Sequence, residues 1–184
     1  HKFKILTLDG NPVPTQATVD VLTLAVAERA DVIVEMNNPG VWIMGAPRDE
    51  DRNKGMGVIV EYSGQTGAPQ WRTPPDRPWD YSIFSGPVPP TRPSPDGKFD
   101  LEFHMLPAED KPFNKWTVNG KLYPETDPLR VKKGKRYRIL LHNGHEDGHP
   151  IHIHRHNFEI VKIAGKPVAG IVKDTVNVPR DGTV

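Results

Sequence analysis

The sequence predicts an all-β protein built as a β-sandwich, and three observations lead to this prediction. Residues that interrupt helices are frequent, since 20 of the 184 residues are proline and 16 are glycine. Apolar and polar side chains alternate in short segments, as they do in strands with one buried face. Turn sequences separate these segments. The strongest of them is Asn119-Gly120, because this pair favours the two-residue turn of a β-hairpin.

The first 62 residues contain five short segments with strand character. Each is an apolar or alternating run bounded by turn-forming residues, and they lie near residues 3–8, 19–26, 31–36, 41–44 and 56–62. A helix is conceivable at residues 22–29, but Val and Thr in that window favour a strand. The charged run at residues 48–54 is expected to be a solvated loop.

Residues 63–98 differ from the rest of the chain in composition. They include nine prolines and no alternating apolar pattern, which predicts an extended, semi-rigid linker. Its aromatic side chains are expected to dock the linker onto a neighbouring surface, and they include Trp71, Trp79, Tyr81 and Phe84. The alternative interpretation is a proline-rich ligand for a recognition module.

Residues 99–184 again have strand character. A strand is expected near residues 99–103, followed by a hairpin at Trp116–Tyr123 that turns at Asn119-Gly120. Another pair of strands is expected within residues 129–140, with the basic run Lys132–Arg138 at a solvated hairpin tip. Apolar positions near residues 158–163 and 172–178 predict the later strands.

Half of the eight histidines lie in one stretch, His149-Pro-Ile-His-Ile-His-Arg-His156. On a strand, His152, His154 and His156 would point to one side, because side chains alternate between the two faces. A buried imidazole needs partners for both ring nitrogens, and a metal ion supplies one of them. The stretch therefore predicts a metal site with His149, His152, His154 and His156 as candidate ligands. The alternative is a solvent-facing loop or an adventitious chelator.

The other histidines carry weaker signals. His142 and His145 are interpreted as residues of the loop that precedes the stretch, and His104 as an ordinary strand residue. His1 would matter only as a mature N-terminus, where its amine and ring nitrogens could chelate copper together.

Charge and composition argue against several kinds of partner. The net charge is +1, so nothing indicates binding to nucleic acid or to an anionic membrane surface. No segment approaches the roughly 20 apolar residues of a membrane-spanning helix, and no signal peptide is recognisable. The chain has no cysteine, which excludes disulfides and thiolate metal ligands within these 184 residues.

An internal repeat relates the two β regions. Residues 156–168 lie over residues 1–13 with the same His, Phe, Ile, Gly, Pro and Val positions, and residues 179–184 match residues 27–32 loosely. The chain is thus expected to hold two incomplete copies of one β domain. The strands that they lack could come from folding both copies into one permuted sandwich, from exchange with a second copy of the chain, or from the rest of a longer protein.

The motifs resemble those of a known family. His149-Pro-Ile-His-Ile-His154, after the strand end Leu140–Asn143 and the turn Thr117–Gly120, looks like the third cupredoxin domain of three-domain multicopper oxidases, the laccases and bilirubin-oxidase-like enzymes. Residues 40–57 look like the end of their second domain. The resemblance implies a cupredoxin-like Greek-key β-sandwich in two incomplete copies. Residues 1–62 would be the C-terminal half of a copper-free domain, residues 63–98 the linker, and residues 99–184 the N-terminal part of a copper-binding domain.

The resemblance also implies a role for three of the histidines. His149 would bind the type 1 copper, where electrons enter, His152 the type 2 copper, and His154 one copper of the type 3 pair, whereas His156 has no counterpart role. Enzymes of this family oxidise phenols and similar small reducing substrates and reduce dioxygen to water. Copper would be the cofactor, and a secreted or periplasmic location is expected.

The chain departs from the family pattern in two respects. The type 1 site requires a cysteine thiolate, and this chain has none. In the first copy, the ligand positions are Gly45, Ala46, Pro47 and Asp51, with only Met56 near an axial position, so that copy cannot rebuild the site. The chain is therefore expected not to be competent alone. The alternatives are a self-standing mononuclear copper-binding β-sandwich with weak or no oxidative activity, and a structural β domain without metal.

Overall fold

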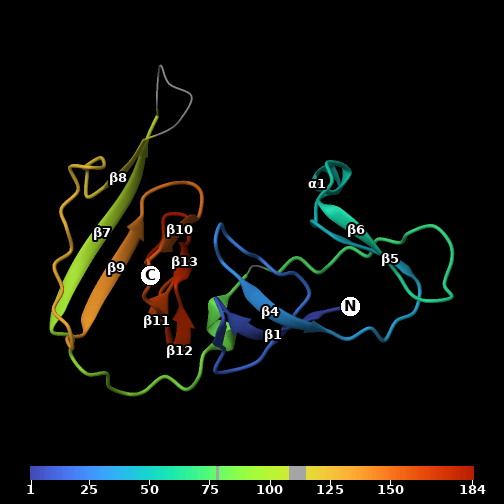
Figure 1. Ribbon diagram of the computed structural model, residues 1–184, viewed down its shortest axis with the longest axis horizontal. Helices are drawn as coiled ribbons and strands as arrows, with labels where there is room; N and C mark the ends of the chain where they lie inside the picture. The colour runs from blue at the N-terminus through green and yellow to red at the C-terminus, as the bar shows by residue number, and fades with distance from the viewer. Residues whose placement is uncertain (78, 108–114) are drawn as a thin grey trace.

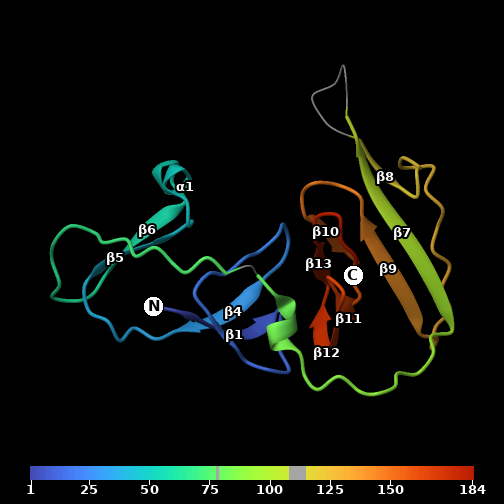
Figure 2. The ribbon, with the colours of Figure 1, turned by 180° about the vertical axis from the view of Figure 1, so that it is seen from behind.

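The computed structural model describes residues 1–77, 79–107 and 115–184, and within these residues the chain is almost entirely β. Pro78 of the expected linker and residues 108–114 of the C-terminal region lie outside the described residues. From one end of the molecule to the other, four groups of strands follow one another (Figures 1 and 2). They are the sheet of β7, β8 and β9, the pairs β10–β13 and β11–β12, the sheet around β1, and the β5–β6 hairpin with α1.

The N-terminal half contains a sheet around one central strand and a separate hairpin. Strand β1 pairs with three others, and the sheet consists of β1 (Phe3–Leu8), β2 (Asn11–Pro12), β3 (Thr18–Val19) and β4 (Ala30–Val34). The hairpin consists of β5 (Val41–Gly45) and β6 (Gly57–Glu61), with the short helix α1 (Asp49–Asn53) between them. Three acidic residues in the first turn of α1 and Arg52 in its last turn suit the helix dipole.

The C-terminal half contains one three-stranded sheet and two pairs of strands. Strand β7 (Gly97–Leu106) pairs antiparallel with β8 (Lys115–Val118) and parallel with β9 (Tyr137–Asn143). Two antiparallel pairs complete this half, and they are β10 (His149–His152) with β13 (Thr175–Val178) and β11 (Phe158–Ile163) with β12 (Lys166–Lys173).

The repeat seen in the sequence is a structural repeat of two hairpins. Strand β1 and strand β11 begin at the matching residues Phe3 and Phe158 and are both followed by a two-residue turn. The first turn residues are Asp9 at φ 50° and Ala164 at φ 47°, each followed by glycine. Register shifts follow the equivalent residues Ile5 and Ile160, in the pairing of β1 with β4 and in that of β11 with β12. Beyond the hairpins, Asp9 N–H donates to the Arg29 carbonyl and Ala164 N–H to the Thr183 carbonyl.

The two halves share one hydrophobic core. Equivalent residues of the two hairpins lie in the same buried cluster, namely Ile5 with Ile160, Leu8 with Ile163, and Val13 with Val168. Strand β1 contacts β12, and Figures 1 and 2 show η1 between β12 and the sheet of β1 and β4. The two copies therefore pack against each other through the same apolar face.

The proline-rich linker is docked between the halves through its aromatic residues, as expected. Residues Tyr81–Phe84 form the 3-10 helix η1, whose N-cap Asp80 accepts a hydrogen bond from Ser82 N–H. Tyr81 and Phe84 are buried, with Phe84 fully covered. The linker backbone bonds to both halves, because Thr15 N–H donates to the Phe84 carbonyl and Gly86 N–H to the Ala169 carbonyl.

Several strand predictions were wrong in detail. Of residues 19–26, only Val19 lies in a strand, and residues 22–29 form no helix either. The charged run at residues 48–54 includes α1 rather than being entirely loop. Residues 129–136 form no strand, and β9 begins only at Tyr137 and pairs parallel with β7. Strand β7 begins at Gly97, so its first two residues fall within the stretch expected to be linker.

Candidate metal centre

Strand β10 places the first two candidate ligands on opposite sides of the sheet. It pairs antiparallel with β13, with His149 opposite Val178 and His152 opposite Thr175. Side chains alternate along a strand, so residues three positions apart face opposite ways. His149 faces β7 and β8, and His152 faces the segment that joins β12 to β13. One metal ion would therefore not be bound by both residues.

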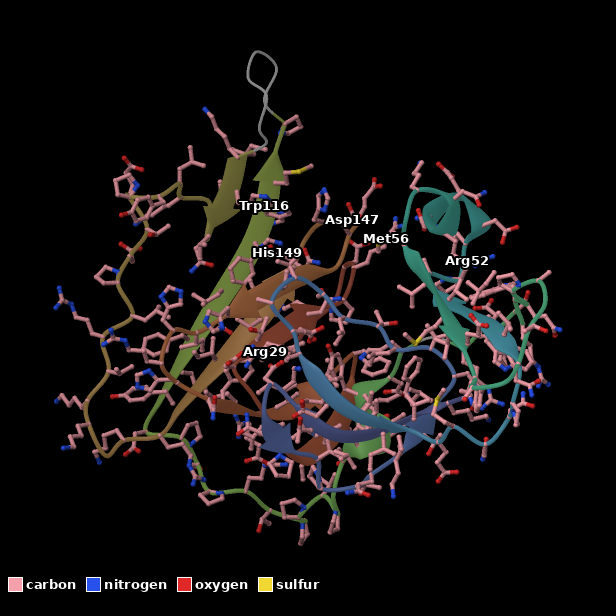
Figure 3. All side chains as sticks on the ribbon, turned by 45° about the vertical axis from the view of Figure 1, so that its right-hand side comes forward. Arg29, Arg52, Met56, Trp116, Asp147 and His149 are labelled. Carbon is pink, nitrogen blue, oxygen red and sulfur yellow. The ribbon has the colours of Figure 1, made fainter. Side chains whose placement is uncertain are left out.

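His149 contacts two aromatic side chains, and Figure 3 shows one of them, Trp116, beside it. Its ring is stacked on Trp116, with centroids 4.1 Å apart and planes at 24°, and its centroid lies 5.6 Å from that of Phe103. Burial, and next the positive charge that His145 can carry nearby, lower the pKa of His149. A lower pKa favours the neutral imidazole, which is the form that binds metals.

The hydrogen bonds of His152 determine which of its nitrogens is available. Its Nδ1 lies 2.9 Å from the Asp174 carbonyl oxygen and 3.0 Å from the Thr175 hydroxyl. A carbonyl can only accept, so Nδ1 carries the proton and donates it, and in the neutral ring the lone pair is then on Nε2. Metal-binding histidines commonly donate their other ring N–H to a carbonyl in this way. His152 thus fits an imidazole ligand bound through Nε2.

The predicted row of three histidines on one strand face is wrong. Strand β10 ends at His152, and His154 and Arg155 form a turn in which Arg155 has φ 62°. The rings of His152 and His154 still lie near each other, with centroids 5.1 Å apart. His156 follows the turn, and its Nδ1 lies 3.1 Å from the His154 carbonyl. Sequence alternation failed because the strand ends at His152 and the chain turns at His154-Arg155, where Arg155 takes a left-handed conformation.

A buried asparagine that the sequence reasoning did not single out organises the loop before β10. Asn143, at the end of β9, donates through its side-chain amide to the carbonyls of Asp147, Val178 and Pro179. Its side-chain oxygen accepts from His145 N–H. His145 lies in this loop, as expected, edge-on to Trp116. His142 lies on β9 rather than in the loop. The only sequence signal for Asn143 is a short polar residue at the end of an apolar segment, directly before Gly144.

The partners of His152 were also missed, and they extend to the N-terminal half. Arg29 donates two hydrogen bonds to the Asp174 carboxylate, at 2.8 and 2.7 Å. These bonds lower the pKa of Asp174 well below its ordinary value. Asp9, with a fully buried side chain, accepts from the backbone N–H groups of Asp174 and Thr175. No sequence pattern connects residues so far apart in the chain.

The described residues do not bring a complete metal-binding shell together. They contain no group of three or more His, Cys, Asp or Glu side chains arranged to bind one ion. Met56, the nearest axial candidate of the first copy, is 64% exposed and directly precedes β6, which Figures 1 and 2 show well apart from β10. The imidazoles of His149, His152 and His154 suit copper individually.

The strand arrangement and the imidazoles on β10 are those expected of a cupredoxin-type copper protein, and comparisons with known proteins agree on the family. Two family profiles, both described as multicopper oxidase, match residues 1–65 and 89–184. The multicopper oxidase MmcO of Mycobacterium tuberculosis (strain ATCC 25618 / H37Rv) is 32% identical over 180 residues, which cover 96% of this chain and 34% of that protein. The chain belongs to the multicopper oxidase family, and copper is the cofactor of that family.

Solved structures show the same fold. The laccase from Botrytis aclada superposes with a TM-score of 0.69 at 18% identity, covering 99% of this chain and 41% of the laccase. Lac15 from a marine microbial metagenome superposes with a TM-score of 0.55 at 24% identity, covering 99% and 41%. The cupredoxin-like β fold is thereby confirmed. The chain spans about a third of the length of its curated relative. None of the helices in the described residues has the length and apolar character needed to cross a bilayer.

Proposed function

We propose that this chain is a copper-binding part of a laccase-like multicopper oxidase that oxidises phenolic or similar small reducing substrates and reduces dioxygen to water. The observation that carries the proposal is His152. Its Nδ1 is committed to the Asp174 carbonyl, its Nε2 is free, and the His154 ring lies beside it. Bound copper would supply one-electron redox chemistry at these imidazoles.

Within this proposal the two faces of β10 serve different coppers. His149 would bind the copper at which electrons enter, and His152 and His154 would bind coppers of the oxygen-reducing cluster. The opposite orientation of His149 and His152 supports the division, since a single ion would not be reached by both. His156 remains a candidate ligand, in an exposed position after the turn.

We also propose that the 184-residue chain alone does not turn over reducing substrates. It has no cysteine, so it cannot supply the thiolate of a type 1 site. Further strands, from a longer protein or from a second copy of the chain, would complete the sheets. Three two-stranded sheets and the exposed Val58 and Ile59 of β6 support this part of the proposal. Relatives are commonly extracellular or periplasmic, and we propose the same location.

Copper titration of the purified chain tests the proposal. We expect stoichiometric copper binding that weakens strongly in His152→Ala and His154→Ala, but not in His104→Ala, whose ring pairs with Glu102 on β7. Electron paramagnetic resonance should show nitrogen ligation without the intense absorption of a copper thiolate. Equal affinity in all three variants would contradict the assignment. Robust oxidation of a phenolic dye by the chain alone would contradict its proposed incompetence, and sedimentation would show whether copies associate.

A further inference from the structure

The N-terminal half contributes a buried carboxylate to the segment that holds His152. Asp9 lies in the turn between β1 and β2, and its side chain is fully covered. Its Oδ2 accepts hydrogen bonds from the backbone N–H groups of Asp174, at 3.2 Å, and of Thr175, at 3.1 Å. These are the same two residues whose carbonyl and hydroxyl contact Nδ1 of His152.

Arg29, also from the N-terminal half, holds the same segment through the side chain of Asp174. Arg29 binds the Asp174 carboxylate with both terminal nitrogens, at 2.8 and 2.7 Å. Arg29 is itself tied to Asp9, because its backbone N–H donates to Asp9 Oδ1 at 2.9 Å and its carbonyl accepts from Asp9 N–H at 2.9 Å. Asp9 and Arg29 thus form one hydrogen-bonded unit that holds Asp174 and Thr175 in place.

The hydrogen bonds of Asp174 and Thr175 determine which nitrogen of His152 carries the proton. The Thr175 hydroxyl donates to Asp174 Oδ1 at 2.9 Å, so its proton is already used. The hydroxyl can then only accept from His152, as the Asp174 carbonyl does. Both contacts require the proton on Nδ1, and both depend on where the backbone of residues 174 and 175 is held.

The internal repeat shows that the turn itself does not need a carboxylate. Ala164 takes the place of Asp9 in the second hairpin, with nearly the same φ, 47° against 50°. The carboxylate is buried next to the Lys173 amine, which lies 3.1 Å from Asp9 Oδ2 and is also fully covered. Burying such a group is costly unless it is well paired, so its presence in only one of two equivalent turns calls for a local role.

We propose that Asp9 and Arg29 are positioning residues for His152, which fix its tautomer and orientation from the opposite half of the molecule through the backbone and side chain of Asp174 and Thr175. The proposal rests on the proposed function in that it takes His152 to be a copper ligand. It adds that the docking of the two halves sets the geometry of that ligand before metal binds.

The first variant is Arg29→Lys, because the Arg29 side chain is half exposed and the protein should fold without it. Lysine keeps the positive charge but cannot form the two parallel hydrogen bonds that Arg29 donates to the Asp174 carboxylate. The matched control is Arg48→Lys, which loosens an exposed pair with Asp51 beside α1. The second variant is Asp9→Asn, whose amide has one acceptor oxygen and so cannot accept from Arg29 N–H as well as from the N–H groups of Asp174 and Thr175.

The first measurement needs no metal. Imidazole ¹⁵N shifts of His152 in the metal-free protein should show the Nδ1–H tautomer in the wild type and in Arg48→Lys. They should show a mixture of tautomers in Arg29→Lys, and more so in Asp9→Asn. A merely structural role would lower the melting temperature without changing the tautomer. Should Asp9→Asn fail to fold, Arg29→Lys alone decides the test.

The second measurement is titration with Cu²⁺ alone. Affinity should fall about 10- to 100-fold in Arg29→Lys, as is typical when a partner of a ligating histidine is lost. An unchanged tautomer and unchanged affinity in a folded Arg29→Lys protein would overturn the positioning role. If His152→Ala binds Cu²⁺ as well as the wild type, the proposed function fails instead, while the metal-free tautomer still decides the positioning role.

Discussion

The Trp116 indole lies flat against the His149 imidazole, with ring centroids 4.1 Å apart. Trp116 comes from β8 and is itself 38% exposed, so it forms the outer wall of the half-buried position that His149 occupies. This stacking removes one face of the imidazole from water. Because water favours the charged form, the indole contributes to the lowered pKa of His149.

Removing the Trp116 side chain should change the pKa of His149. In Trp116→Ala, the pKa of His149 is expected to rise towards its ordinary value, because the ring gains solvent and the protonated form is less disfavoured. An NMR pH titration of the imidazole in the metal-free protein measures this directly. Trp42→Ala is the matched control, because Trp42 lies edge-on to His1 instead. A pKa that stays the same or falls would show that Trp116 does not shield the ring.

The repeat provides a test of the shared core. Ile5→Ala and Ile160→Ala remove equivalent, fully buried side chains, so each should lower the free energy of unfolding by about 2–5 kcal/mol. Because both residues belong to one cluster, each variant should unfold in a single transition when followed by denaturant titration. Ile59→Ala, at a position 62% exposed, should stay within about 0.5 kcal/mol. Two separate transitions in either core variant would contradict a common core.

A pair of glycines in the β5–β6 hairpin should respond oppositely to the same substitution. Gly45 and Gly57 are cross-strand partners. A Cβ at Gly45 would lie 2.5 Å from the Met56 carbonyl oxygen, whereas at Gly57 the nearest atom is 3.6 Å away, on the Arg52 side chain. Gly45→Ala should therefore destabilise the protein by about 1–3 kcal/mol. Gly57→Ala should be neutral or stabilising by up to about 1 kcal/mol. Thermal melts compare them, and equal losses would contradict the close approach at Gly45.

Two carboxylates that fasten the linker should make stability sensitive to acid. Asp80 pairs with Lys166 and Glu159 with Arg92. Burial alone raises the pKa of each. For Asp80, the hydrogen bonds from Lys166 and Ser82 outweigh this effect of burial, so its pKa is lowered. For Glu159, the hydrogen bonds from Gly170 N–H and Arg92 do the same.

A carboxylate whose pKa is lower in the folded protein than in the unfolded chain stabilises the fold at pH values above its unfolded pKa. This stabilisation is lost as the pH falls through its folded pKa. The double variant Asp80→Asn, Glu159→Gln should thus be less stable near neutral pH and should lose less stability below about pH 4. Chemical denaturation at several pH values measures the slope, with Glu61→Gln on the exposed side of β6 as the control. A slope equal to that of the wild type would show that the pairs contribute nothing.

The sequence was most informative where local rules decide the structure. Alternation, turn pairs and the repeat predicted β1, β11 and the turn at Asn119-Gly120, because each depends on residues close together in the chain. The same rules failed at His154, which lies in a turn after β10 has ended at His152, and at residues 129–136, which form no strand. Family motifs identified His149, His152 and His154 as candidate ligands. Their supports, Asp9, Arg29 and Asn143, are brought together only by tertiary packing.

The common core of the two hairpins affects how the protein is made. Ile5 and Leu8 leave the ribosome well before Ile160 and Ile163, which belong to the same buried cluster. At the usual rate of elongation the nascent chain waits roughly 10 to 30 s with this apolar face uncovered. During that interval the first hairpin is open to chaperones and to aggregation. Contacts between such distant residues also make folding slow after release.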